Sequence, residues 1–239
     1  TGPPPPVSAS WEAHASCLAF EFSSGRSRIL VNCGVPAVGR DTWRQVARST
    51  AAHSTAVIAD TSSCRFLAGA RMTRLMGVPI VAGPKEVDVQ RGERAGAVLL
   101  RASHDGYLEE FGVVHQRSWR LALDGSRLDG EDVFRGSAEG SAPSDQPFAI
   151  RFHLHPAVKV ERLDDPSTAL LSLPTGEAWV FAAPHVPLAI EESVYLAATG
   201  GPRRSAQLVL AGQAVHTPRV IWTFVRTREA TPMQVSPAR

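Results

Sequence analysis

Alternation of apolar and polar residues with a period of two is the feature that most constrains this chain. In the segment 18–22, Leu18, Phe20 and Phe22 would share one face of a strand, with Glu21 on the other. Many short strands of this kind, separated by turn residues, are typical of a sandwich or barrel. The sequence therefore predicts an all-β fold, a large antiparallel β-sandwich of the super-sandwich type with many short strands.

We expect strands along nearly the whole chain, beginning with 18–22. The others are 28–32, 55–59, 86–90, 97–103, 113–123, 148–155, 158–163, 168–173, 178–182, 188–195, 203–211 and 219–226. Turns such as Asp129-Gly130 separate them. Helical periodicity is confined to about 42–52, and the Gly/Ser/Pro-rich stretch 136–147 predicts a loop. Strands of the same kind flank that loop, which indicates one domain over 1–239.

The charge balance argues against nucleic acid as the main partner. Lys and Arg total 25 against 23 Asp and Glu, whereas a phosphate-binding surface usually shows a clear basic excess. A local basic groove for an acidic sugar polymer stays open, because nearly all the cations are Arg, whose forked donors suit carboxylates and sulfates. The other interpretation is a codon preference for Arg. No stretch approaches the roughly 20 apolar residues of a membrane span.

The three cysteines, Cys17, Cys33 and Cys64, are odd in number and lack C-x-x-C spacing. They therefore predict neither a disulfide framework nor a Cys-based zinc site. The opening run Gly2-Pro3-Pro4-Pro5-Pro6 is what we would expect in the middle of a longer protein.

The histidines gather in polar clusters. His153 and His155 would lie on one face of a strand, as would His115 and Arg117. Paired histidines on a strand can hold zinc with further ligands from another strand, or can be hydrogen-bonded structural side chains. A cupin-like metal enzyme built on the His153 and His155 pair is one further alternative.

The run His104-Asp105-Gly106-Tyr107 brings together an imidazole, a carboxylate and a phenol. These groups could relay protons, or Asp105 could cap a turn. Phosphate-binding glycine loops and the G-x-S-x-G nucleophile motif are absent from the sequence.

Seven segments in order resemble the C-terminal region of the heparinase II/III-like family, and they span nearly the whole chain. They are AHASCLAFEFS (13–23), VNCG (31–34), RSTAAHST (48–55), HDGY (104–107), HQR (115–117), FHLHP (152–156) and EESVY (191–195). The resemblance implies a β-sandwich that follows an N-terminal α/α-toroid domain, which is absent from this chain. It also implies a polyanionic polysaccharide as partner, bound in the cleft between the two domains.

Enzymes of this family are polysaccharide lyases that cleave uronate-containing chains by β-elimination. The resemblance therefore implies that this chain completes the cleft of a lyase and is inactive without the helical domain. It also implies a periplasmic or secreted protein, with the cytoplasm as the alternative. A second hypothesis is a non-catalytic module, either structural or binding an anionic glycan.

On this resemblance we expect catalytic groups among His14, His104, Tyr107 and His115. We expect substrate-binding groups among four further residues of the same segments. These are Arg48, Arg117, His153 and His155.

The family also implies a structural zinc in some members, bound by two His and one Asp. His14 and His53 match the two histidines, and Asn32 stands where the Asp is expected. Glu12 occupies the position of the family's catalytic His, and Ser16 replaces a common Asp. We therefore expect any zinc ligands among His14, Asn32 and His53, in a site that departs from the family pattern.

Overall fold

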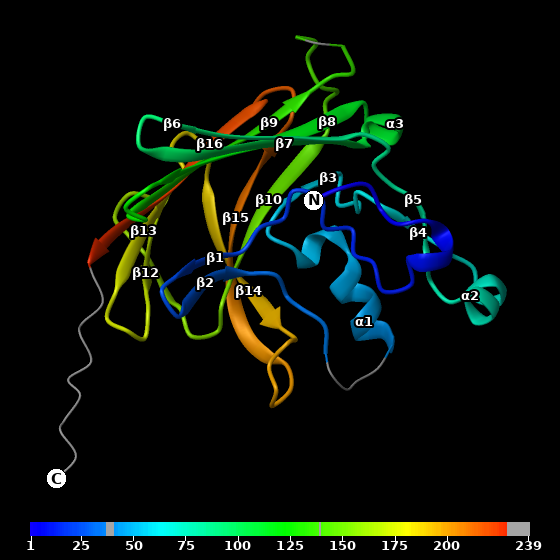
Figure 1. The fold of residues 1–239 in the computed structure, drawn as a ribbon, viewed down its shortest axis with the longest axis horizontal. Helices are drawn as coiled ribbons and strands as arrows, with labels where there is room; N and C mark the ends of the chain where they lie inside the picture. The colour runs from blue at the N-terminus through cyan, green and yellow to red at the C-terminus, as the bar shows by residue number, and fades with distance from the viewer. Residues whose placement is uncertain (37–40, 139, 229–239) are drawn as a thin grey trace.

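Two antiparallel sheets pack face to face in the computed structural model, which describes residues 1–36, 41–138 and 140–228 (Figure 1). In spatial order, the larger sheet consists of β11 (Lys159–Arg162), β12 (Thr168–Ser172), β13 (Ala178–Ala182), β16 (Arg219–Arg228), β9 (Arg127–Arg135), β8 (Val113–Ala122), β7 (Ala97–Tyr107) and β6 (Val87–Arg94). The smaller consists of β1 (Phe22–Ser24), β2 (Ser27–Val31), β10 (Pro147–Leu154), β15 (Arg203–Gln213) and β14 (Leu188–Tyr195), with β3 (Ala56–Ile58) paired to β10.

The remaining elements are short and lie mainly between β2 and β8. They are α1 (Asp41–Arg48), α2 (Ala70–Met76), α3 (Leu108–Phe111), the two-stranded sheet of β4 (Arg65–Phe66) and β5 (Ile80–Ala82), and the 3-10 turns Val7–Ala9 and Thr50–Ala52. Among the described residues no helix combines the length and hydropathy that a membrane crossing requires.

The core lies between the two sheets, as the period-two alternation predicts. Phe152 of β10 projects across it onto Trp222 and Phe224 of β16, with the Phe152 and Trp222 ring centroids 5.0 Å apart. Phe181 of β13 completes this aromatic group at 4.8 Å from Phe224. All four side chains are buried, so the sheets are held by apolar area and by edge-to-face ring contacts of about 1 kcal/mol each.

Most predicted strands are confirmed to within a few residues, including 28–32, 178–182 and 188–195. The helical pattern at 42–52 is also confirmed, as α1 followed by a 3-10 turn. The predicted loop 136–147 connects β9 to β10, and its residue 139 lies outside the described residues.

The prediction for 18–22 is wrong, because only Phe22 of that segment belongs to a strand. Leu18 has a left-handed φ of 57°, which turns the chain and interrupts an extended conformation. Its side chain is nevertheless buried. The apolar alternation of this segment therefore reflects burial of an irregular edge segment.

The turn predicted at Asp129-Gly130 is also wrong, and it concealed β9. Both residues lie inside β9, which pairs with β8 on one side and β16 on the other. Gly130 stands opposite Trp119 and Trp222, and a Cβ at this glycine would lie only 2.0 Å from the indole ring of Trp222. The glycine is required by the width of the neighbouring indole and does not form a turn.

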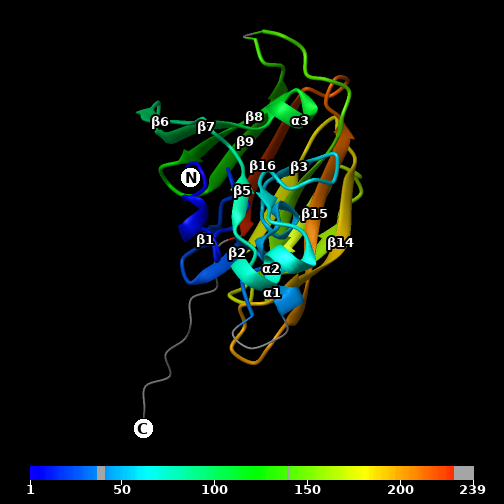
Figure 2. The ribbon, with the colours of Figure 1, turned by 90° about the vertical axis from the view of Figure 1, so that its right-hand side faces the viewer.

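The N-terminal segment lies beneath the β6–β8 end of the larger sheet, as the dark-blue trace shows in Figures 1 and 2. Thr1 and Leu18 line an apolar cavity of about 500 Å³ together with Val89, Leu100 and Trp119 of that sheet. This edge of the sandwich is therefore covered by irregular chain, and it is where His14 lies.

We expect Gly130→Ala to destabilise the fold by about 1–3 kcal/mol, because the added methyl group overlaps the ring of Trp222. Gly92→Ala is the matched control, since a Cβ there meets nothing within 4 Å. Denaturant unfolding of both variants measures the difference. Equal stability of the two would contradict the packing argument.

Candidate functional site

The predicted site residues divide into a buried network inside the sandwich and an accessible cavity at its N-terminal edge. His104, Tyr107, His115 and Arg117 belong to the interior, where each is at most 2% exposed. His14 is half-buried and lines the edge cavity. The sequence placed His115 and Arg117 on one face of a strand, as found in β8, but did not reveal which histidines were accessible.

Asp132 of β9 is the centre of the buried network, and its carboxylate has three side-chain partners. Arg117 donates from Nε to Oδ1 at 2.7 Å and from Nη2 to Oδ2 at 3.1 Å. His115 Nε2 lies 2.6 Å from Oδ1, and Trp222 donates from Nε1 to Oδ2 at 2.8 Å. These groups come from three adjacent strands, so the carboxylate fastens β8, β9 and β16 to one another.

A directional chain of hydrogen bonds leads to this carboxylate. The Gly106 N–H donates to His104 Nδ1 at 3.1 Å, so the neutral ring carries its proton on Nε2. His104 Nε2 then donates to His115 Nδ1 at 3.3 Å, and His115 Nε2 donates to Asp132. Each ring thus uses one donor and one acceptor, and both imidazoles are satisfied in their neutral forms.

The charges of the network follow from burial and from Arg117. Burial lowers the pKa of His104 and His115, so both rings remain neutral at pH 7. Burial by itself would raise the pKa of Asp132, but the charge of Arg117 and the hydrogen bond from His115 outweigh it and hold the pKa at about 2. The network is a buried ion pair with two neutral rings, closed to solvent.

Two of the predicted site residues hold loops and strands in place. Tyr107 is fully buried, and its hydroxyl donates to the Ala56 carbonyl at 3.2 Å. Arg48 donates to the carbonyls of Ser10, Ala13 and Val78 at 2.7–2.8 Å. In the described conformation neither group reaches solvent, so neither can contact a polymer.

His153 and His155, on the outer side of the smaller sheet, have different surroundings. His153 is buried, with Nδ1 2.8 Å from Ser193 Oγ and Nε2 2.9 Å from the Ala51 carbonyl. His155 is half-buried, accepts a hydrogen bond from the Ala157 N–H at 3.2 Å, and packs against Tyr195. The two rings thus hydrogen-bond to separate partners.

The edge cavity has a volume of about 390 Å³ and brings together the three predicted zinc ligands. His14, Asn32 and His53 line it. Glu21 also lines it, although it was not among the site residues predicted from the sequence. Asn32 Oδ1 accepts from the Ser54 N–H at 2.9 Å, while its Nδ2 donates to Glu21 Oε1 at 3.3 Å.

His14 and His53 are joined directly, with His14 Nδ1 2.9 Å from His53 Nε2. His53 Nδ1 lies 2.7 Å from the Ser49 carbonyl, which can only accept, so the proton of neutral His53 is on Nδ1. His53 Nε2 is then the acceptor and His14 Nδ1 the donor. Neutral His14 therefore carries its lone pair on Nε2.

Burial lowers the pKa of both rings. For His53 it lowers the pKa to about 4, opposed by the hydrogen bond to Ser49. For His14 burial is again the largest cause and Arg48 adds to it, while Glu12 and the Ala47 carbonyl oppose it. His14 is thus a neutral imidazole at pH 7 on the wall of an accessible cavity, which is the protonation state of a general base.

The donors in this cavity fit zinc poorly. Two imidazole nitrogens on one tetrahedral zinc lie roughly 3.3 Å apart, whereas those of His14 and His53 share a proton at 2.9 Å. Asn32 offers a neutral amide oxygen that already accepts from Ser54. Among the described residues no group of three or more His, Cys, Asp or Glu side chains could hold a metal ion. Zinc at this position stays a prediction.

Sequence reasoning missed Asp132, the residue on which the buried network depends. The signal was available, because His115 and Arg117 on one strand face require an anion when buried. The acid lies on β9, however, the strand hidden by the supposed turn at Asp129-Gly130. Cys17, Cys33 and Cys64 are free and buried.

The fold and the site together define a class: an antiparallel super-sandwich with a histidine-lined cavity at its N-terminal edge. The family model "Heparinase II/III-like, C-terminal" matches residues 1–223. This chain belongs to that family, as its sequence motifs had indicated.

The similar proteins are all much longer. FtsZ-localized protein C of Caulobacter vibrioides is 32% identical over 221 residues, which are 89% of this chain and 37% of that protein. The heparan sulfate lyase HepC of Pedobacter heparinus, in a mutant form, gives a TM-score of 0.69 at 13% identity, covering 92% of this chain and 32% of the lyase. A heparinase III, the BT4657 gene product, gives 0.67 at 12% identity, covering 91% and 31%. The two solved structures support the fold.

We expect Asp132→Asn to destabilise the fold by about 3–5 kcal/mol, because it leaves the Arg117 guanidinium buried without its counter-charge. Asp129→Asn, which removes a carboxylate from exposed ion pairs on the same strand, is the matched control at under about 1 kcal/mol. Chemical denaturation distinguishes the two. A cost below 1 kcal/mol at Asp132 would show that the network is not structural.

The free energy of unfolding is expected to fall as pH drops from about 6.5 to about 4. His53 and His153, with folded pKa values of about 4, bind fewer protons when folded than when unfolded in this window, so stability rises with pH. At about 1.4 kcal/mol per pKa unit, His153 contributes up to about 3 kcal/mol. Denaturant titrations at several pH values measure the slope, and His153→Gln should flatten it. A pH-independent stability would contradict the burial of these rings.

Proposed function

We propose that this chain is the C-terminal domain of a polysaccharide lyase and completes a cleft for a uronate-containing anionic glycan. The observation that carries the proposal is the edge cavity, in which a neutral, accessible His14 is oriented by His53. The chain spans about a third of the length of its relatives. A further domain would therefore supply the other wall of the cleft.

β-Elimination requires neutralisation of the uronate carboxylate, a base for the C5 proton and an acid for the departing O4 oxygen. His14 fits the role of base, because Nε2 carries the lone pair in its neutral tautomer. Arg48 and Arg117 cannot neutralise the uronate, since both are buried. That role, and the acid, would come from the domain that is absent from this chain.

A non-catalytic module is the second candidate, and two observations favour it. The imidazoles of His104 and His115 are fully satisfied inside the protein, and Glu12 occupies the family's catalytic His position. The curated relative at 32% identity is named for its localisation with FtsZ, whereas the lyases match at 13% or less. Such a module would bind an anionic glycan, or a partner domain, without turnover.

The full-length protein is expected to release unsaturated products from heparan sulfate, alginate or chondroitin, followed by their ultraviolet absorbance. His14→Ala should lower kcat/KM by about 100-fold or more, the usual contribution of a general base. His216→Ala should leave kcat/KM unchanged, because His216 is an exposed turn residue that does not line this cavity.

Binding without absorbance on all three polymers would exclude the lyase and favour the non-catalytic module. Absorbance that survives His14→Ala would instead place the base elsewhere.

A further inference from the structure

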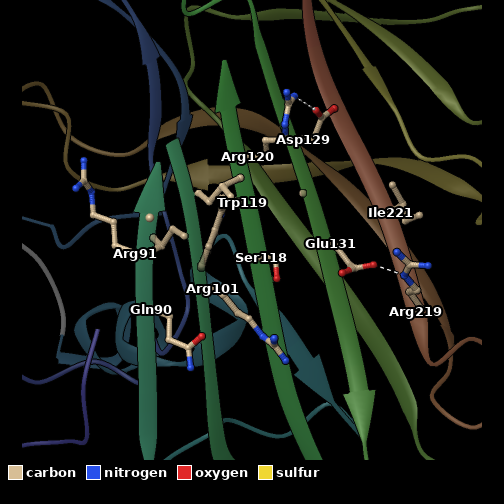
Figure 3. A pocket seen from close by; sticks show the side chains of 14 residues that line it. Gln90, Arg91, Arg101, Ser118, Trp119, Arg120, Asp129, Glu131, Arg219 and Ile221 are labelled. Atoms are coloured by element: carbon tan, nitrogen blue, oxygen red, sulfur yellow. Dashed lines mark hydrogen bonds and ion pairs between the residues drawn. The ribbon is translucent and has the colours of Figure 1, made fainter. Parts of the chain in front are cut away.

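A second cavity, here called the outer groove, lies on the face of the larger sheet that points away from the core. It has a volume of about 570 Å³ and crosses five strands, from β6 to β16 (Figure 3). Arg101, Arg120 and Arg219 line it from three different strands, and none of the described residues lines both this groove and the edge cavity of His14.

The charged side chains that line the outer groove give it an excess of positive charge. Four arginines line it against two carboxylates: Arg91, Arg101, Arg120 and Arg219 with Asp129 and Glu131. A groove with excess positive charge attracts anionic ligands.

Arg101 is the cation in this groove that no carboxylate neutralises within the described residues. Its Nη2 donates to the neutral amide oxygen of Gln116 at 2.6 Å, and that bond fixes the guanidinium over the sheet. Arg120 and Arg219 pair with Asp129 and Glu131, as the dashed lines in Figure 3 show. Exposed pairs of this kind contribute under about 1 kcal/mol, so an incoming polyanion can replace them.

We propose that the outer groove binds a sulfated or uronate-containing glycan at a site separate from the edge cavity. Neighbouring strands are about 4.8 Å apart, so Arg101 on β7 and Arg219 on β16 are separated by roughly 14 Å across the sheet. The register of these strands places Arg120 and Arg219 on opposite sides of the row that holds Arg101, so the anionic groups of one glycan lying over the groove would meet the three arginines at separate points. Arg forks bind carboxylates and sulfates through paired charge-assisted hydrogen bonds.

A glycan fits this surface better than an acidic peptide does. Four of the five strands beneath the groove (β7, β8, β9 and β16) are paired on both sides, so their backbone N–H and C=O groups are already bonded within the sheet, and only β6 lies at the sheet edge. A peptide lying across Leu99 and Ile221 would leave its own amides without backbone partners. A glycan needs only cations and hydroxyl partners, and Ser118 and Gln90 offer the latter.

The test is isothermal titration of the full-length protein with a heparin-derived hexasaccharide, in a His14→Ala background that slows turnover. Arg101→Gln combined with Arg219→Gln should weaken one binding event at least about tenfold, and the apparent stoichiometry should fall by one. Arg204→Gln is the matched control, because Arg204 is an exposed, ion-paired arginine on β15 of the other sheet. That control should change the affinity less than twofold.

Three outcomes overturn this site: an unchanged stoichiometry and affinity, an equal loss with Arg204→Gln, or equal competition by polyglutamate, which would indicate an acidic polypeptide. The proposal goes beyond the lyase assignment and fails separately from it. If the hexasaccharide does not bind while short substrates are still cleaved, the outer-groove proposal fails and the lyase proposal stands. If the hexasaccharide binds but no substrate is cleaved, the proposal of a lyase site in the edge cavity fails and the outer-groove proposal stands.

Discussion

The buried pair of Arg117 and Asp132 is the interaction on which the rest of the structure depends. Both side chains are completely excluded from solvent, which for isolated charges would be prohibitive. The pair is tolerated because Arg117 donates to both oxygens of Asp132, at 2.7 and 3.1 Å, and because His115 and Trp222 supply further donors to Asp132. This polar centre fixes the register of β8, β9 and β16 within an otherwise aromatic core.

The same guanidinium determines where the functional edge lies. Arg117 Nη1 donates to the carbonyls of Leu18 and Ser54, at 3.2 and 2.8 Å, and so ties the N-terminal segment to the larger sheet. Arg48, the last residue of α1, donates to the Ala13 carbonyl and so ties the chain immediately before His14 to that helix. His14 is thus positioned by two buried arginines that were expected to bind substrate and that instead support the cavity from within.

The sequence predicted the architecture well because burial of one strand face is a local, repeating constraint. It failed where a long-range contact overrides a local signal. Asp129-Gly130 resembles a turn, but Gly130 is a glycine because Trp222 lies against its backbone. Leu18 and Phe20 alternate like strand residues but lie on an irregular segment. The supposed turn hid β9 and with it Asp132, the partner of His115. The supposed strand at 18–22 hid the irregular edge of the sandwich at which His14 lies.

The hydrogen-bond partners of Asn32 explain why an asparagine stands where the family has an aspartate. An amide can accept and donate at once, and Asn32 accepts from the Ser54 N–H while donating to Glu21. An aspartate at this position could not donate to Glu21 and would place two carboxylates side by side. In this chain Asn32 therefore links Glu21 to the segment after His53, where the family's aspartate would serve a metal. The histidine pair can then be held by its own hydrogen bond, with the Ser49 carbonyl taking the orienting role.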